Sequence, residues 1–301
     1  MSGLLGPYDI RVPHQSVSAA VPGGELVGWV TGNGPPVLLL HGGPGLSYGY
    51  LDALATELGD GYRTASYQQR GLAPSTTAGP FTVERQVDDA TSFLDALGWE
   101  RAFVVGHSWG GHLLMHLAVS SPGRLHGALA VDPLGGVGDG AMAVFEREMA
   151  ARIPAEDRRR AVELDEAALR GEATAAELTE SLRIFWPAYF ASPENAPAMP
   201  DIHLSIEAYS GVIASLKEAL PGLSAALGAV TVPFGFVAGA DSPMPVDASS
   251  AATAAIIPGA WLEVVGGAGH FPWMEKPGRV RAALDRLVAG SPASGGEGEG
   301  R

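Results

Sequence analysis

The sequence predicts a mostly parallel, doubly wound α/β sheet that carries an inserted helical cap. Short apolar runs, of the kind that a parallel sheet buries on both faces, alternate with segments whose apolar residues recur at helical spacing. This alternation stops after Asp132, gives way to helical, charge-bearing sequence over 138–221, and then resumes. An insertion between two halves of one sheet is expected to cover the carboxyl edge of the strands, where such folds bind ligands.

The elements are expected in a definite order along the chain. Residues 17–21 and 25–31 flank a Pro-Gly-Gly turn and predict an antiparallel hairpin. Buried strands are expected at 37–41, 62–67, 102–106, 125–131, 232–238 and 262–265, and helices at 48–58, 82–97, 109–120, 249–256 and 278–287. The predicted units are a core of 1–137 with 222–290, the cap at 138–221, and a Gly/Glu-rich disordered tail at 291–301.

Composition and charge exclude several classes of function. Hydrophobic residues make up 46% of the 301 positions, which is enough for a packed core. The 19 basic residues against 33 acidic ones give a formal charge of −14, which argues against nucleic acid or a membrane as a partner. The absence of cysteine excludes disulfides, thiolate metal sites and a cysteine nucleophile. Without a signal peptide or a membrane-length apolar run, we expect a cytoplasmic protein with a small-molecule or short-peptide substrate.

A serine nucleophile is predicted at position 108. The segment 106–111 reads GHSWGG, matches G-x-S-x-G, and lies between a predicted strand and a predicted helix. A sharp reversal at this point requires small residues on either side of a serine held in a strained conformation, with its hydroxyl projecting from the sheet. The free N–H groups at the start of the next helix favour negative charge beside Ser108.

A second glycine-rich segment predicts an oxyanion hole. Residues 41–45 read HGGPG and follow the strand at 37–41. The backbone N–H of Gly43, supported by that of Gly42, is expected to act with the N–H of Trp109 on a developing oxyanion. No phosphate-binding glycine motif is present, so a phosphate cradle is not expected here.

His270 is the predicted general base, and its acidic partner has alternatives. His270 lies in a glycine-rich loop after the last strand, and a loop histidine there titrates near neutral pH and can reach the serine. Asp241 follows the preceding strand and completes the order Ser-Asp-His, so it is the preferred acid. Asp132 also ends a strand, next to that of the serine, and is the alternative acid; Asp247 is a third candidate.

The remaining candidates concern substrate contacts and metal binding. The aromatic residues of the cap are expected either to form ordinary core or to line the pocket above the substrate, and substrate contacts are proposed for Phe185, Trp186, Tyr189 and His107. His112 and His116 are spaced like the histidines of a zinc-protease helix but lack its glutamate, so they are expected to be packed core residues. No metal site is predicted.

These motifs resemble the proline iminopeptidase branch of the α/β-hydrolases (peptidase family S33). The resemblance rests on HGGPG at 41–45, on G-x-S-W-G at 106–110, and on the loops of Asp241 and His270. It implies an α/β-hydrolase fold with a lid, no cofactor, and a Ser-His-Asp mechanism. Gln68 departs from the branch, which usually has aspartate there, and His107 and Gly111 stand where glycine and serine are typical.

Three functions are weighed on this basis. The preferred one is acyl-enzyme hydrolysis of a small-molecule ester, lactone or amide. The first alternative is a proline-type aminopeptidase, which would need a cap acid to hold the substrate amine; Glu194 and Glu207 are the nearest candidates. The second alternative is a non-catalytic binding protein on the same scaffold. Epoxide hydrolases and haloalkane dehalogenases share the architecture but use an aspartate where this chain has Ser108.

Overall fold

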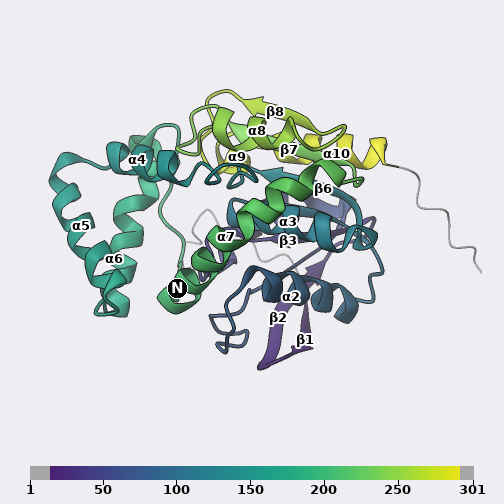
Figure 1. The fold of residues 1–301 in the computed structure, drawn as a ribbon, viewed down its shortest axis with the longest axis horizontal. Coiled ribbons are helices and arrows are strands. Elements are labelled where there is room, and N and C mark those ends of the chain that lie inside the picture. Colours follow the sequence, from purple (N-terminus) through teal and green to yellow (C-terminus); the bar gives the residue numbers. More distant parts are fainter. Residues whose placement is uncertain (1–13, 292–301) are drawn as a thin grey trace, which may run out of the picture.

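The computed structural model describes residues 14–291 and contains one eight-stranded sheet (Figure 1). The strand order is β1-β2-β4-β3-β5-β6-β7-β8. Apart from Ser291, the predicted tail lies outside the described residues. The strands are β1 Gln15–Val21, β2 Gly24–Thr31, β3 Pro36–Leu40, β4 Arg63–Tyr67, β5 Ala102–His107, β6 Leu125–Val131, β7 Phe234–Gly239 and β8 Trp261–Val265.

The sheet is antiparallel at one end and parallel elsewhere. The predicted hairpin is confirmed, because β1 pairs antiparallel with β2, and β2 then pairs antiparallel with β4. From β4 through β3 to β8 every pairing is parallel. The loops that follow β3, β5, β6, β7 and β8 therefore emerge at one edge of the sheet, which is where ligands bind in parallel sheets.

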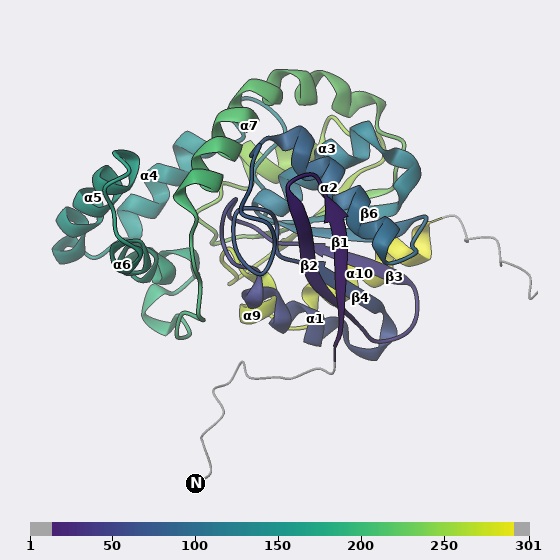
Figure 2. The same ribbon diagram turned by 90° about the horizontal axis from the view of Figure 1, so that it is seen from below.

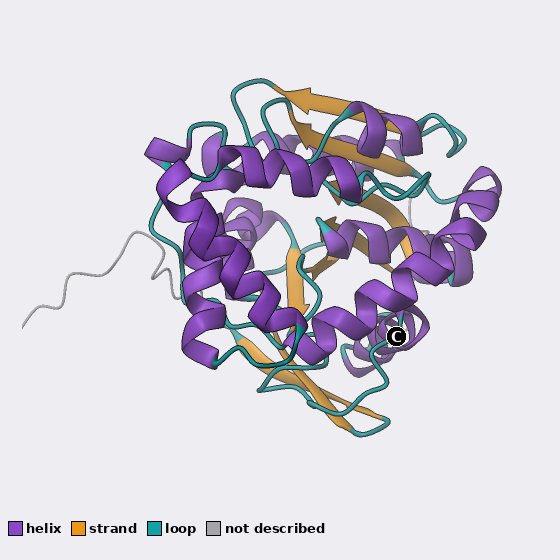
Figure 3. Cartoon of the chain, turned by 60° about the vertical axis from the view of Figure 1, so that its left-hand side comes forward, coloured by secondary structure: helices purple, strands orange, loops and turns teal. Residues whose placement is uncertain are grey.

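Helices cover both faces of the sheet, as the alternation of elements predicts (Figures 2 and 3). One face carries α2 and α3, with α7 packed against them, and the other face carries α1, α9 and α10. Among residues 14–291, no helix has both the length and the apolar character needed to cross a bilayer. The helices are α1 Asp52–Leu58, α2 Val83–Ala96, α3 Trp109–Ser120, α4 Met142–Arg152, α5 Ala155–Leu169, α6 Ala175–Phe185, α7 Ile206–Ala226, α8 Ala252–Ala254, α9 Pro272–Glu275 and α10 Arg279–Gly290.

The inserted segment is mostly helical, with a non-helical stretch at 196–205 before α7. Helices α4, α5 and α6 stand at the side of the sheet, and α5 packs on α6 (Figure 1). Helix α7 runs back across α3 and α2, so its apolar face belongs to the same core as those two helices. The expected boundary between 221 and 222 falls inside α7, which continues through Pro221 to Ala226.

Candidate active site

Ser108 occupies a strained turn between a buried strand and a helix. It follows β5 directly, has φ 53° and ψ −118°, and precedes α3. Two positions before Ser108 and two positions after it, only glycine fits. A Cβ at Gly106 would lie 2.2 Å from the Gly110 carbonyl oxygen, and one at Gly110 would lie 2.1 Å from the Leu40 carbonyl oxygen. The small flanking residues thus allow the backbone approach that holds a non-glycine residue at positive φ.

The carboxylate that holds His270 is Asp132. The Asp132 Oδ2 atom lies 2.5 Å from His270 Nδ1, and both side chains are buried. Asp132 follows β6 and has φ 44°. Its carboxylate also accepts hydrogen bonds from the Gly239 N–H (3.0 Å) and the Ser242 hydroxyl (2.5 Å). Three donors fix this carboxylate, so His270 is held with its Nδ1 toward Asp132 and its Nε2 available for other contacts.

The expected preference for Asp241 over Asp132 as the partner of His270 is therefore corrected. Asp241 is exposed, and its Oδ2 accepts a hydrogen bond from the Gly267 N–H at 2.9 Å. Strand β6 lies between β5 and β7 in the sheet, so the residue that ends β6 lies between the serine turn and the β7 loop. The loop after β7 contributes the Ser242 hydroxyl, which donates a hydrogen bond to the Asp132 carboxylate. It does not contribute the acid that bonds to His270.

The glycine-rich loop after β3 lies against the serine. A Cβ at Gly42 would lie 2.7 Å from the Ser108 Cβ. The Gly42 N–H donates to the Tyr50 hydroxyl (2.5 Å), so it is engaged and does not support the oxyanion hole as expected. Within the described part of the chain, the N–H groups of Gly43 and Trp109 have no acceptor. Two free donors beside a serine can stabilise a negatively charged oxygen.

His107 does not have the substrate contact expected of it. Its side chain is 2% exposed. Its Nδ1 lies 2.9 Å from the Tyr50 hydroxyl, and its Nε2 lies 2.9 Å from the His270 carbonyl oxygen. Burial, with a further contribution from the nearby His270, lowers the pKa of His107 well below the usual histidine value. His107 is therefore neutral, and both of its ring nitrogens are engaged within the protein.

Aromatic side chains from the inserted segment cover the imidazole of His270. Tyr189 stacks on this ring at a centroid distance of 5.2 Å, and Phe145 of α4 lies 6.0 Å away. The Tyr189 carbonyl also accepts the His270 N–H at 2.8 Å. Of the other expected contacts, Trp186 is buried against Phe190 and Phe271 as core. Phe185 is partly buried, and it is not among the described residues whose rings contact that of His270. The sequence had not singled out Phe145.

Comparisons with known proteins identify the family of this chain. A sequence model described as the alpha/beta hydrolase family matches residues 37–283. The chain belongs to the alpha/beta hydrolase family. Among solved structures, this hydrolase superposes on a thermophilic esterase from Thermogutta terrifontis with a TM-score of 0.63 and 23% identity, covering 92% of this chain and 98% of the esterase. It also superposes on proline iminopeptidase from Mycobacterium smegmatis with a TM-score of 0.62 and 24% identity, covering 91% and 97%.

Curated relatives match the hydrolase over a shorter stretch. Epoxide hydrolase B of Mycobacterium tuberculosis is 35% identical over 109 residues, which cover 35% of this chain and 31% of the relative. Proline iminopeptidase of Clostridium botulinum is 32% identical over 90 residues, which cover 29% of this chain and 31% of the relative. The matched segments thus span about a third of the length of these relatives. The relatives have different activities, so the family alone does not assign a substrate.

Two adjacent glutamines support the loops of the site. Gln68, which stands where the iminopeptidase branch usually has aspartate, donates from Nε2 to the Leu46 carbonyl (3.0 Å) and accepts the Tyr48 N–H (3.2 Å). A carboxylate could not donate the first of these bonds. Gln69 donates to the His41 carbonyl (2.9 Å) and accepts from the Trp109 indole (2.8 Å). The pair therefore links the glycine-rich loop to the start of α3, which sequence reasoning had not foreseen.

The expected core role of the two spaced histidines agrees with their surroundings in α3. His112 and His116 face each other with 3.3 Å between their Nε2 atoms, and His112 also contacts the Gly135 carbonyl. Burial lowers the pKa of His112 to about 4 and that of His116 to about 3. Over residues 14–291, no group of three or more histidines and acids is placed to hold a metal ion.

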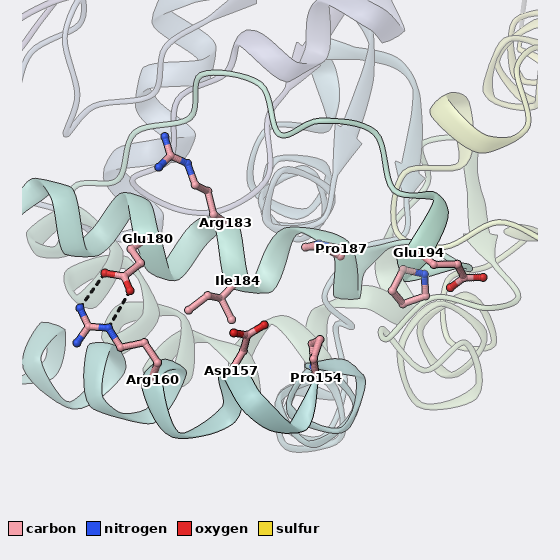
Figure 4. Close-up of a pocket in the computed structure, with 9 residues that line it drawn as sticks. Pro154, Asp157, Arg160, Glu180, Arg183, Ile184, Pro187 and Glu194 are labelled. Atoms are coloured by element: carbon pink, nitrogen blue, oxygen red, sulfur yellow. Dashed lines mark hydrogen bonds and ion pairs between the residues drawn. The ribbon is translucent and has the colours of Figure 1, made fainter.

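A groove of about 600 Å³ lies within the inserted segment (Figure 4). It runs between α5 and α6 and is lined by apolar and charged side chains, among them Ile184 and Glu194. Arg160 and Glu180 form a bidentate ion pair at one end, with N···O distances of 2.8 and 2.7 Å. Neither Ser108 nor His270 lines this groove.

Proposed function

We propose that this chain is a serine hydrolase that cleaves a small carboxylic ester or a related lactone or amide. The observation that carries the proposal is the buried Asp132–His270 hydrogen bond, at the edge of the sheet where Ser108 projects in its strained turn. The free N–H groups of Gly43 and Trp109 supply what an acyl-transfer site needs in addition.

The mechanism follows from these roles. His270 Nε2 removes the Ser108 proton as Oγ attacks the substrate carbonyl, and the new oxyanion accepts hydrogen bonds from Gly43 and Trp109. The imidazolium returns the proton to the leaving group as the C–O or C–N bond breaks, which leaves an acyl-serine. A water molecule, deprotonated by His270, then attacks this ester, and the imidazolium returns the proton to Ser108 Oγ as the acyl C–Oγ bond breaks. Asp132 holds the imidazole in the required tautomer and stabilises its charged form.

The surroundings of the site favour an uncharged acyl group. Phe145 and Tyr189 present aromatic surface next to His270. An aminopeptidase would need an acid to hold the substrate amine. Of the two sequence candidates, Glu194 lines the separate groove and Glu207 is exposed at the start of α7. Both carboxylate oxygens of Glu275, in α9, are already bonded, to the N–H groups of Gly269 and Ala191.

A comparison of two chromogenic substrates tests the proposal. We expect measurable kcat/KM for 4-nitrophenyl butyrate, little or none for prolyl-4-nitroanilide, and loss of ester turnover by several orders of magnitude in Ser108→Ala. Preference for the prolyl substrate would instead favour the aminopeptidase, as the names of some relatives suggest. Ester turnover by Ser108→Ala within about tenfold of the wild type would contradict the mechanism.

A further inference from the structure

We propose that Tyr50 and His107 form a buried positioning pair that connects the oxyanion loop to the backbone of the general base. The inference rests on the proposed function, since it assigns roles in that reaction. The His107 ring lies beside the imidazole of His270, at a centroid distance of 4.6 Å. Both residues are proposed to act by positioning the loops to which they bond.

The pair is defined by three consecutive hydrogen bonds. The Gly42 N–H donates to the Tyr50 hydroxyl oxygen (2.5 Å). The Tyr50 hydroxyl lies 2.9 Å from His107 Nδ1, and His107 Nε2 lies 2.9 Å from the carbonyl oxygen of His270. The chain of bonds therefore begins next to the oxyanion donor Gly43 and ends on the residue that bears the general base.

The donor and the acceptor in each bond follow from the two groups at the ends of the series, the Gly42 N–H and the His270 carbonyl. The His270 carbonyl can only accept, so His107 Nε2 carries the proton and Nδ1 is left as an acceptor. Tyr50 must then donate its hydroxyl proton to Nδ1, and its oxygen receives the Gly42 N–H. Only one tautomer of His107 satisfies all three bonds. Burial lowers the pKa of His107 well below the usual value and raises that of Tyr50, so both side chains stay neutral as this arrangement requires.

The pair also explains which backbone donor remains for the substrate. Because Tyr50 accepts the Gly42 N–H, that group is turned away from the oxyanion, and the next N–H, that of Gly43, is left without an acceptor among the described residues. The Gly42 backbone approaches Ser108 so closely that a Cβ there would lie 2.7 Å from the Ser108 Cβ. A small displacement of this loop would therefore alter the donor geometry at the site, where about 1 Å can cost 10²-fold in rate.

Packing holds the pair in a single arrangement. Tyr50 is 6% and His107 is 2% exposed. Phe271 meets the Tyr50 ring edge to face at 5.7 Å, and Trp273 meets the His107 ring edge to face at 4.8 Å. Such enclosed hydrogen-bonded groups are costly to leave unpaired, so the three bonds act together rather than singly.

The first test removes the Tyr50 hydroxyl and keeps its ring. We expect Tyr50→Phe to lower kcat for 4-nitrophenyl butyrate by about 10- to 100-fold, with KM within about threefold of the wild type. Tyr62→Phe is the matched control, because its buried ring also loses one hydroxyl bond, to Asp285 on α10, and this bond is not part of the series that joins Gly42 to His270. We expect its kcat to be unchanged. Equal kcat in Tyr50→Phe and the wild type would overturn the inference.

The second test separates hydrogen bonding from packing at position 107. Glutamine offers one acceptor and one donor in place of the two ring nitrogens, whereas phenylalanine fills the space without either. We expect His107→Gln to keep kcat within about fivefold of the wild type and His107→Phe to lose as much as Tyr50→Phe. Retention of activity by the phenylalanine variant with loss by the glutamine variant would contradict the assigned role.

A spectroscopic measurement tests the pair without reference to activity. In the ¹⁵N–¹H spectrum of the histidine side chains, His107 is expected to carry its proton on Nε2 in the wild type and to lose this fixed tautomer in Tyr50→Phe. A wild-type His107 protonated on Nδ1 would overturn the inference even in an active enzyme. An inactive wild type with the expected tautomer would instead contradict the proposed function and leave the positioning pair in place.

Discussion

Asp132 adopts a left-handed backbone conformation that costs free energy in any residue other than glycine. This conformation places its carboxylate between the Gly239 N–H, the Ser242 hydroxyl and His270 Nδ1. The buried charge is thereby hydrogen-bonded on both oxygens, which a buried carboxylate requires. Backbone strain thus occurs at Ser108, the proposed nucleophile, and at Asp132, the proposed acid.

At the residue scale, two aspartate-to-asparagine variants distinguish the acids. We expect Asp132→Asn to lower kcat for an ester by about 10³–10⁴-fold, because the amide can hold His270 only in the wrong tautomer. Asp241→Asn is expected to stay within about threefold, since asparagine can still accept the Gly267 N–H bond. Steady-state kinetics on both variants measures the two changes in kcat, and circular dichroism checks that both variants are folded. A larger loss of kcat in Asp241→Asn than in Asp132→Asn would identify Asp241 as the acid.

The sequence could place Ser108 and His270, but its order of motifs pointed to Asp241, whereas Asp132 is the acid bonded to His270. A pentapeptide flanked by a strand and a helix is a local signal, and so is a histidine in a glycine-rich loop. The choice of acid depends instead on which neighbouring strand ends beside His270, and this is a long-range property of the sheet. Tyr50, Ser242 and Gln69 gave no local signal, because their roles arise only from the contacts of distant segments.

At the scale of elements, the serine turn depends on close approach between β3 and α3. Alanine is about 1 kcal/mol more favourable than glycine inside a helix. At Gly110 a steric clash outweighs this gain, because a Cβ would lie 2.1 Å from the Leu40 carbonyl oxygen. We expect Gly110→Ala to lower the free energy of unfolding by about 3 kcal/mol and to abolish ester hydrolysis. Urea denaturation measures the first effect.

A second helical glycine provides the control for that variant. Gly222 lies within α7, and a Cβ there meets no atom within 4 Å. Gly222→Ala is therefore expected to raise the free energy of unfolding by about 0.5–1 kcal/mol and to leave activity unchanged. Destabilisation of the same size in both variants would show that the close approach of α3 to β3 does not cause the loss of stability in Gly110→Ala.

The bounds predicted from the sequence match the structure closely for some elements and not for others. The buried strands and the amphipathic helix α2 lie within a residue or two of their predicted ranges, since hydrophobic periodicity marks them directly. The end of the cap was expected at Pro221, where the helical pattern of the sequence ended. In the structure α7 continues past this residue, and its packing on α2 and α3 stabilises it there.

At the scale of the whole molecule, buried neutral histidines make folding sensitive to acid. Burial lowers the pKa of His41 and His112 to about 4 and that of His116 to about 3. The unfolded chain binds a proton at each of these sites near pH 6.5, whereas the folded chain does not. Stability is thus fully present above about pH 6.5 and is lost as the pH falls from there toward 4.

A histidine variant tests this pH dependence. The free energy of unfolding of the wild type is expected to fall between pH 6.5 and 5, with up to about 1.4 kcal/mol per pH unit from each such histidine. In His116→Gln one of these contributions is absent, so its profile should be less steep over the same range. Urea unfolding at four pH values in this interval measures both slopes. Parallel profiles would contradict the contribution assigned to His116.

An acyl-enzyme reaction at Ser108 can be tested by labelling with a fluorophosphonate, followed by mass spectrometry of the intact chain and its peptides. We expect one adduct per chain on Ser108, none in Ser108→Ala, and much slower labelling in Asp132→Asn. A folded wild-type protein that is not labelled, or that is labelled at another residue, would contradict a nucleophilic role of Ser108.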